Sequence, residues 1–238
     1  MSKVVTPPEI LNVISNYVQT ALKRDIITLQ TSGNPRADSL ANQPVIGDSL
    51  RAFTLCHPLF VKHGLVFEVP SSPQFWCDFV IRTLDDRIWL PINLKVSSFR
   101  GRDDLSSKDG LFYALTGKDP EHCDWDRYCQ ELAAHLKRDN CCADYYYIVV
   151  QKSRPGTPRG NVFWTSLLAL RCVHPNGNRP PFQCHWAENT ERLSWPRKEA
   201  VAYLLGVLEE TLTLRANASA SFKKHLTPML RGWGPKPV

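Results

Sequence analysis

The alternation of apolar and polar residues predicts a β-hairpin near the middle of the chain. Residues 75–83 and 88–96 are rich in β-branched and aromatic side chains with a period of two, which is typical of strands. The polar segment between them favours a turn. With Asp85 and Asp86 at its tip, paired positions sum to 171. Asp78 then lies opposite Asn93, and Lys95 follows on the same face.

The other face of this hairpin carries Phe79, Ile81, Ile92 and Leu94, which we expect in a hydrophobic core. A polar trio thus projects from one side of a sheet whose other side is apolar. One face of an antiparallel pair is often solvated, so the trio by itself does not require a function.

Apolar residues at helical spacing predict a first helix from Pro7 to Leu22, with Thr6 as its N-cap, and we expect it to serve packing or dimerisation. Residues 31–48 are rich in Ser, Gly, Asn, Pro and Asp and predict a loop. A short helix is expected over 49–60, ended by Pro58, and a strand over 65–69.

The second half of the chain alternates between the two element types. Helices are expected over 107–115, with Ser106 or Ser107 as cap and Gly117 after the end, over 124–137 and over 197–214. Strands are expected over 144–150 and 182–186, while 162–170 fits a strand or a short helix. Residues 175–181 predict a turn-rich loop.

Composition bounds these readings. A chain of 238 residues that is 43% hydrophobic can bury one sizeable core, and a net charge of +6 points to an anionic partner such as nucleic acid. Residues 211–238 hold five basic and no acidic residues, which fits either a solvated tail or a DNA contact. No apolar leader follows Lys3 and no window approaches the ~18 apolar residues of a membrane span, so we expect a cytoplasmic protein whose cysteines are free thiols.

The hairpin resembles the core of the PD-(D/E)xK nucleases. Cys77-Asp78 stands in the place of the Pro-Asp, and Asn93-Leu94-Lys95 in the place of the (D/E)xK. The stretches 91–98 and 111–117 extend the likeness to type II restriction endonucleases of the blunt-cutting, EcoRV-like branch, and to a group that recognises GGNNCC. The resemblance covers residues 65–186.

This resemblance implies an α/β fold, with a restriction-endonuclease-like mixed central sheet flanked by helices in a single endonuclease domain spanning 1–238. Residues 1–30 would hold the N-terminal helix, 65–186 the catalytic core, and 196–238 the C-terminal helix and basic tail. The implied activity is Mg²⁺-dependent hydrolysis of phosphodiester bonds in double-stranded DNA at a short site, in the bacterial cytoplasm. A homodimer is expected, because a two-fold protein matches a palindromic site.

The resemblance also assigns roles within the hairpin. Asp78 would bind Mg²⁺, the Leu94 carbonyl would add an oxygen ligand, and Lys95 would orient the attacking water and stabilise charge on the phosphate. Asn93 departs from the family pattern, since a carboxamide brings no negative charge. The missing carboxylate would come from Glu68, or from an acid in the following loop or helix: Asp103, Asp104 or Asp109.

Three interpretations of Asn93 therefore stay open: a tolerated variant, a relocated carboxylate, or a protein that binds DNA and cuts it poorly. Two rival functions follow, a DNA-binding protein with a degenerate nuclease site and a repair or structure-selective nuclease.

Several residues away from the hairpin are candidates for DNA contact. Planar guanidinium groups bind phosphate oxygens, while Arg, Asn and Gln are the types that read base edges. Ion pairing and ordinary turn propensity explain the same residues without DNA. The candidates are Arg100, Arg102, Lys152, Arg154 and Arg159 for phosphates, and Asn176, Asn178, Arg179 and Gln183 for bases.

Two close cysteine–histidine pairs, Cys172 with His174 and Cys184 with His185, have a spacing loosely similar to that of zinc sites. Neither is a CxxC, so packed or surface thiols are the default interpretation. No glycine-rich phosphate loop or nucleophile elbow is present, and we expect no small-molecule organic cofactor.

Overall fold

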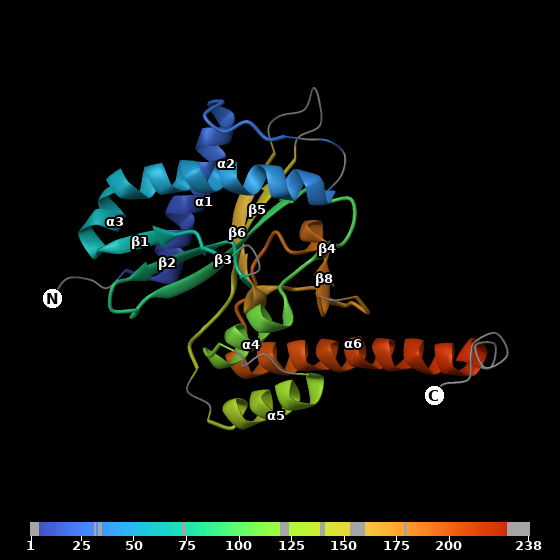
Figure 1. The fold of residues 1–238 in the computed structure, drawn as a ribbon. Coiled ribbons are helices and arrows are strands. Elements are labelled where there is room, and N and C mark those ends of the chain that lie inside the picture. Colours follow the sequence, from blue (N-terminus) through green and yellow to red (C-terminus); the bar gives the residue numbers. More distant parts are fainter. Residues whose placement is uncertain are drawn as a thin grey trace.

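A five-stranded mixed sheet forms the centre of the protein in the computed structural model, which describes residues 5–30, 32, 35–72, 75–119, 124–138, 141–152, 160–178 and 180–227 (Figure 1). Its strands lie in the order β1-β2-β3-β5-β6, and all neighbours are antiparallel except β3 and β5, which are parallel. The strands are β1 (Leu65–Glu68), β2 (Phe79–Thr83), β3 (Trp89–Ser97), β5 (Tyr146–Gln151) and β6 (Val162–Ser166).

Helices cover both faces of this sheet (Figure 1). One face carries α1 (Pro7–Lys23), α2 (Pro35–Cys56) and α3 (Pro58–His63), and the other carries α4 (Lys108–Thr116), α5 (Trp125–Leu136) and α6 (Arg197–His225). The expected α/β fold with a mixed central sheet flanked by helices is therefore confirmed. The far end of α6 extends beyond the rest of the molecule.

Each face of the sheet has its own hydrophobic core. Ile81, Ile92 and Leu94 belong to the core under α1 and α2, as the alternation predicts. The next residues along the strands, such as Val80 and Val149, belong to the core under α4 and α6. The face that carries the polar trio is thus also covered, and a polar side chain there lies at the margin of a core.

Local signals place several helices correctly. Thr6 and Glu9 form a capping box at the start of α1, where the Thr6 amide donates to Glu9 Oε2 at 2.8 Å. Ser107 caps α4 by accepting from the Gly110 amide, and Gly117 ends it in the left-handed region at φ 69°. The undecided stretch 162–170 is a strand followed by the 3₁₀ helix η1 (Leu167–Ala169). The final helix continues past its predicted end at 214.

The predicted loop over 31–48 is wrong, because α2 occupies most of it. Polar residues take core positions on this helix and so hide its period. Asp38 and Asn42 are both buried, and the Asn42 side chain bonds both backbone groups of Gln30. Pro44 lies inside the helix, where it costs a backbone hydrogen bond. Burial of Ile46 and Leu50 against the sheet outweighs that cost.

A second, three-stranded antiparallel sheet was not predicted as a unit. Its order is β4-β8-β7, from β4 (Asp103–Asp104), β8 (Phe182–Cys184) and β7 (His174–Pro175), and the 3₁₀ helix η2 (Trp186–Glu188) follows β8. Figure 1 shows β4 and β8 side by side between the central sheet and α6. Within the described residues, no helix is long and apolar enough to cross a membrane.

Candidate active site

The hairpin pairs in the predicted register, with one correction at its end. Phe79 lies opposite Ile92 and Ile81 opposite Leu90, so paired positions sum to 171 as expected. Beyond them, the Asp78 amide donates to the Ile92 carbonyl at 2.9 Å. Asp78 and Phe79 therefore both oppose Ile92, as in a β-bulge, and Asp78 does not pair directly with Asn93. A bulge bends the strand and re-aims the side chain it carries.

The Asp78 carboxylate lies beside β3 beyond the end of β2. Its Oδ2 accepts from the Leu94 amide at 2.7 Å, and its Oδ1 accepts from Gln43 Nε2 at 2.9 Å. Burial raises the pKa of Asp78, while the Leu94 hydrogen bond and the charge of Lys95 act against this. Desolvation destabilises the charged form of this carboxylate, and a nearby cation stabilises it. The Asp78 side chain is therefore suited to binding a metal ion.

The sequence gives no signal for Gln43, because residues 31–48 have the composition of a loop although Gln43 lies in α2. Gly47 lies one turn further along the same face of α2, where a Cβ would stand 2.9 Å from Cε1 of Phe79. The absent side chain lets α2 rest on β2 at this point, and Gln43 thereby reaches the neighbouring Asp78. Only the packing of a helix on a strand some 35 residues away reveals this contact.

Lys95 is the second component of the site. Its Nζ donates to the Leu105 carbonyl at 3.2 Å. Burial lowers the pKa of Lys95, and the charges of Asp78 and Asp103, with a smaller contribution from Asp104, oppose that shift. A partly buried lysine whose pKa is lowered by desolvation can release a proton more readily than an exposed one.

The acids named as possible second carboxylates fall into two groups. Both oxygens of Glu68 accept from Arg82, at 3.0 and 2.8 Å, so Glu68 is engaged in an ion pair between β1 and β2. Asp103 and Asp104 of β4 lie within electrostatic reach of Lys95. The structure therefore brings the β4 acids to the lysine and leaves Glu68 bound to an arginine.

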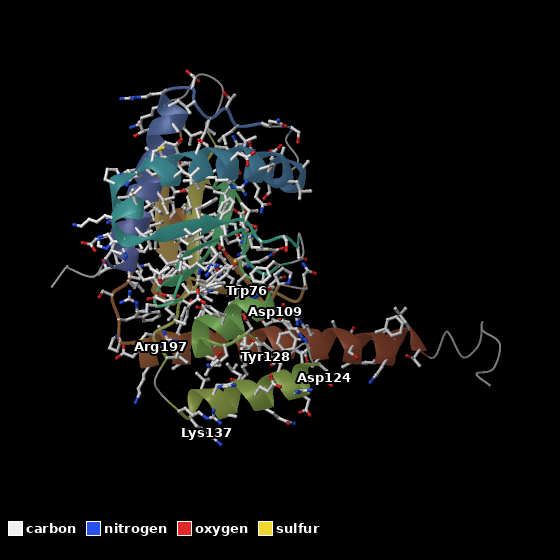
Figure 2. The ribbon with its side chains drawn as sticks, turned by 60° about the vertical axis from the view of Figure 1, so that its left-hand side comes forward. Trp76, Asp109, Asp124, Tyr128, Lys137 and Arg197 are labelled. Carbon is white, nitrogen blue, oxygen red and sulfur yellow. The ribbon has the colours of Figure 1, made fainter. Side chains whose placement is uncertain are left out.

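Two acid oxygens in this region are buried without a hydrogen-bond partner among the described residues. They belong to Asp103 Oδ2 and Asp109 Oδ1. Asp109 lies in the first turn of α4, and its side chain is labelled on that helix in Figure 2. An unpaired buried carboxylate oxygen is costly, which is consistent with a place for a cation near β4.

Asn93 has a local reason to be an amide. Its side chain forms a hydrogen bond with the hydroxyl of Tyr145, which itself donates to the Trp76 carbonyl at 2.7 Å. Because the hydroxyl proton is used on Trp76, the bond to Tyr145 needs a donor at residue 93, and a carboxylate has none. The Asn93 amide supplies the donor and keeps its Oδ1 as an acceptor.

The candidate DNA contacts separate into three groups. Lys152 forms an ion pair with the buried Asp38, so its charge is compensated within the fold. Arg100 and Arg102 are exposed between β3 and β4, next to the site, and Asn178 is exposed further on. Arg154, Arg159 and Arg179 lie outside the described residues.

Asn176 and Gln183, which were named as candidates for base reading, both contact Asp104 within the fold. Asn176 is buried, and its Nδ2 donates to Asp104 Oδ1 at 3.1 Å. Gln183 Nε2 donates to the same oxygen at 2.9 Å. Both side chains therefore orient the Asp104 carboxylate.

Comparisons with known proteins do not assign the chain to a family. A scan against protein-family models finds no match, and a search of the curated proteins finds no similar sequence.

Proposed function

We propose that the protein is a Mg²⁺-dependent type II restriction endonuclease that hydrolyses both strands of duplex DNA at a short site. One observation carries the proposal: the partly buried carboxylate of Asp78 and the partly buried ammonium of Lys95 lie within electrostatic reach of each other in the hairpin, and the charges of the β4 acids also act on the lysine. Cleavage of both strands at a palindromic site calls for a two-fold symmetric dimer, so we propose a homodimer as the active form.

The donor set fits a hard divalent cation. Asp78 supplies carboxylate oxygens, Asn93 an amide oxygen, and Asp103 a buried oxygen that lacks a protein partner among the described residues. Within a strand, the amide and carbonyl of one residue face the same edge, so the Leu94 carbonyl faces the side on which its amide meets Asp78. Oxygen ligands of this kind suit Mg²⁺, which when bound would stabilise charge on the phosphate and acidify a water.

Lys95 would act on the attacking water. Because burial lowers its pKa, the ammonium can give up and take back a proton near neutral pH more easily than a solvated lysine can. In its charged form it would stabilise negative charge on the scissile phosphate. Its bond to the Leu105 carbonyl directs the side chain toward β4, and the acids there would help to hold the charge.

Arg100 and Arg102 would bind DNA phosphates next to this site. Both are exposed and follow directly after β3, the strand that carries Lys95. Phosphate contacts of this type position the duplex without reading its sequence. Base reading would fall to other residues, with Asn178 as the exposed candidate among those described.

Incubation of the full chain with plasmid DNA and Mg²⁺ tests the proposal. Discrete fragments are expected, lost on chelation with EDTA and lost in Lys95→Ala, while Lys62→Ala, an exposed lysine of α3, serves as the matched control and should cut normally. Nicking or smearing would favour a repair or structure-selective nuclease instead. A gel shift without any cleavage, at every Mg²⁺ concentration, would refute the nuclease.

The DNA-binding protein without cleavage stays as a second candidate, because Asn93 replaces the acid of the family pattern. The β4 acids argue against this second candidate. Their negative charge acts on Lys95 and could replace the charge that Asn93 lacks.

A further inference from the structure

A cluster of metal-ligating side chains lies apart from Asp78, at the far side of the small sheet. Cys172 Sγ and His174 Nε2 are 3.4 Å apart, and the same nitrogen is 3.7 Å from Glu188 Oε2. The ligand atoms of these three residues all lie within 4.8 Å of one another. Two of the residues are partly buried, and Glu188 is exposed at the end of η2.

We propose that Cys172, His174 and Glu188 bind one zinc ion, with His185 as the fourth ligand. A tetrahedral Zn²⁺ with Zn–S of about 2.3 Å and Zn–N of about 2.0–2.1 Å places sulfur and nitrogen about 3.6 Å apart, and nitrogen and oxygen about 3.4 Å apart. The observed separations are close to both values. Two of the three donor separations are therefore close to those that a single zinc ion requires, and the third, between Cys172 and Glu188, lies within 4.8 Å.

His185 is the candidate for the fourth ligand, and because it lies outside the three donors that stand within 4.8 Å of one another, its side chain would move toward them on binding. It directly precedes η2, and Glu188 lies three residues further on, the spacing at which side chains share a face of a 3₁₀ helix. The His185 and His174 rings are 6.2 Å apart between centroids. A hydrogen bond from Cys172 lowers the pKa of Glu188, and His185 and His174 add to this effect, so the other three groups all act on Glu188.

The backbone beneath the cluster is held firmly in place. The Asn189 side chain is fully buried, accepts from the Arg171 and Cys172 amides, and donates to the Cys172 and His185 carbonyls. The Tyr203 hydroxyl of α6 contacts both backbone groups of Val173. The two ligand-bearing segments are thus fixed before any ion arrives, which reduces the ordering cost of binding.

The residue types select zinc over magnesium. A thiolate and two imidazoles are ligands that zinc favours, whereas Mg²⁺ prefers oxygen. The Cys172 thiol would release its proton to the solvent on binding, so affinity should rise with pH. A bound zinc would link β7 to η2. Because His174 of β7 pairs with Gln183 of β8, the ion would also stabilise β8, whose Gln183 side chain orients Asp104.

Metal titration of the full chain tests this site without reference to DNA cleavage. After removal of metal with a chelator, one equivalent of Zn²⁺ should bind and raise the Tm, and Co²⁺ should give a tetrahedral spectrum with a thiolate charge-transfer band. Cys172→Ser should weaken zinc affinity by more than about 100-fold and remove that band, a loss at least as large as that from an outer-shell partner. Cys56→Ser, an exposed thiol of α2, is the matched control.

Further variants keep the test decisive. His185→Ala should weaken zinc affinity and shift the Co²⁺ spectrum toward a site with an open position, and His174→Gln provides a second ligand loss if Cys172→Ser does not fold. Absence of stoichiometric Zn²⁺ binding by the folded wild-type chain would overturn the proposal, as would unchanged affinity in folded Cys172→Ser.

Discussion

Asp144 offers a quantitative test of the buried electrostatics. It directly precedes β5, and its Oδ1 accepts from the Tyr145 amide at 2.8 Å and from the Leu168 amide at 3.3 Å. Burial raises its pKa from 3.8 to about 6, although these bonds and a bond with Ser166 favour the charged form. At about 1.36 kcal/mol per pKa unit, that difference corresponds to about 3 kcal/mol.

The sign of the effect follows from proton binding. Because the folded state holds the Asp144 proton more tightly than the unfolded chain, this group makes the unfolding free energy fall as pH rises from about 4 to about 6. Above that range the charged side chain costs the folded state up to about 3 kcal/mol. The variant Asp144→Asn keeps the Oδ1 acceptor and carries no charge. It should therefore be more stable than wild type at pH 7 by up to that amount.

Urea unfolding followed by tryptophan fluorescence, at a series of pH values between 4 and 8, measures this difference. The wild-type and Asp144→Asn curves should diverge as pH rises from about 4 to about 6 and keep a constant separation above that range. Asp48→Asn, at an exposed carboxyl of α2, is the control and should run parallel to wild type. Parallel curves for Asp144→Asn as well would refute the claim that burial controls this group. The pKa of Asp78 is also raised by burial, so a pH profile measured in Asp144→Asn reports on Asp78 without the titration of Asp144.

The remaining predictions concern the proposed catalytic site. Lys95→Ala should reduce DNA cleavage by at least about 100-fold, measured as fragment release, while gel-shift affinity is retained; full cutting would remove Lys95 from the site. Asp78→Asn should raise the Mg²⁺ concentration needed for cutting and abolish the fall in activity at acid pH that protonation of Asp78 causes; an unchanged Mg²⁺ titration would contradict its role. Asp104→Asn should also raise the Mg²⁺ requirement if β4 supplies the second carboxylate, and wild-type behaviour would point to another acid. Asn93→Asp should leave activity flat or reduced, because the new carboxylate cannot donate to Tyr145; a lower Mg²⁺ requirement would show instead that an acid is missing at this position.

Sequence reasoning located the hairpin because its information is local. Strand alternation and a short polar turn determine a register, and Phe79 does pair with Ile92 as that register requires. The caps at Thr6 and Ser107 were equally visible, since a cap depends on neighbours three residues away. The α/β class followed from such elements together with the resemblance.

The sequence alone did not reveal the second acid, in β4, or the residues around the site. The β4 strand has two residues, too few to show any alternation, and it exists only because Phe182–Cys184 pairs with it some eighty residues later. Gln43 was hidden for a related reason, since polar residues on α2 occupy buried positions and disguise its helical period.

The chain by itself therefore predicted the hairpin and most of the central sheet, and it pointed to Asp78 and Lys95 as residues of the proposed site. Only the tertiary structure decided their surroundings. These are the bulge at Asp78, the packing of α2 on Phe79 at Gly47, and the charges of the β4 acids that act on Lys95. The same holds for Cys172, His174 and Glu188, which two separate segments bring together. Local preference acts over a few residues, whereas packing joins residues whose separation along the chain leaves no periodic trace.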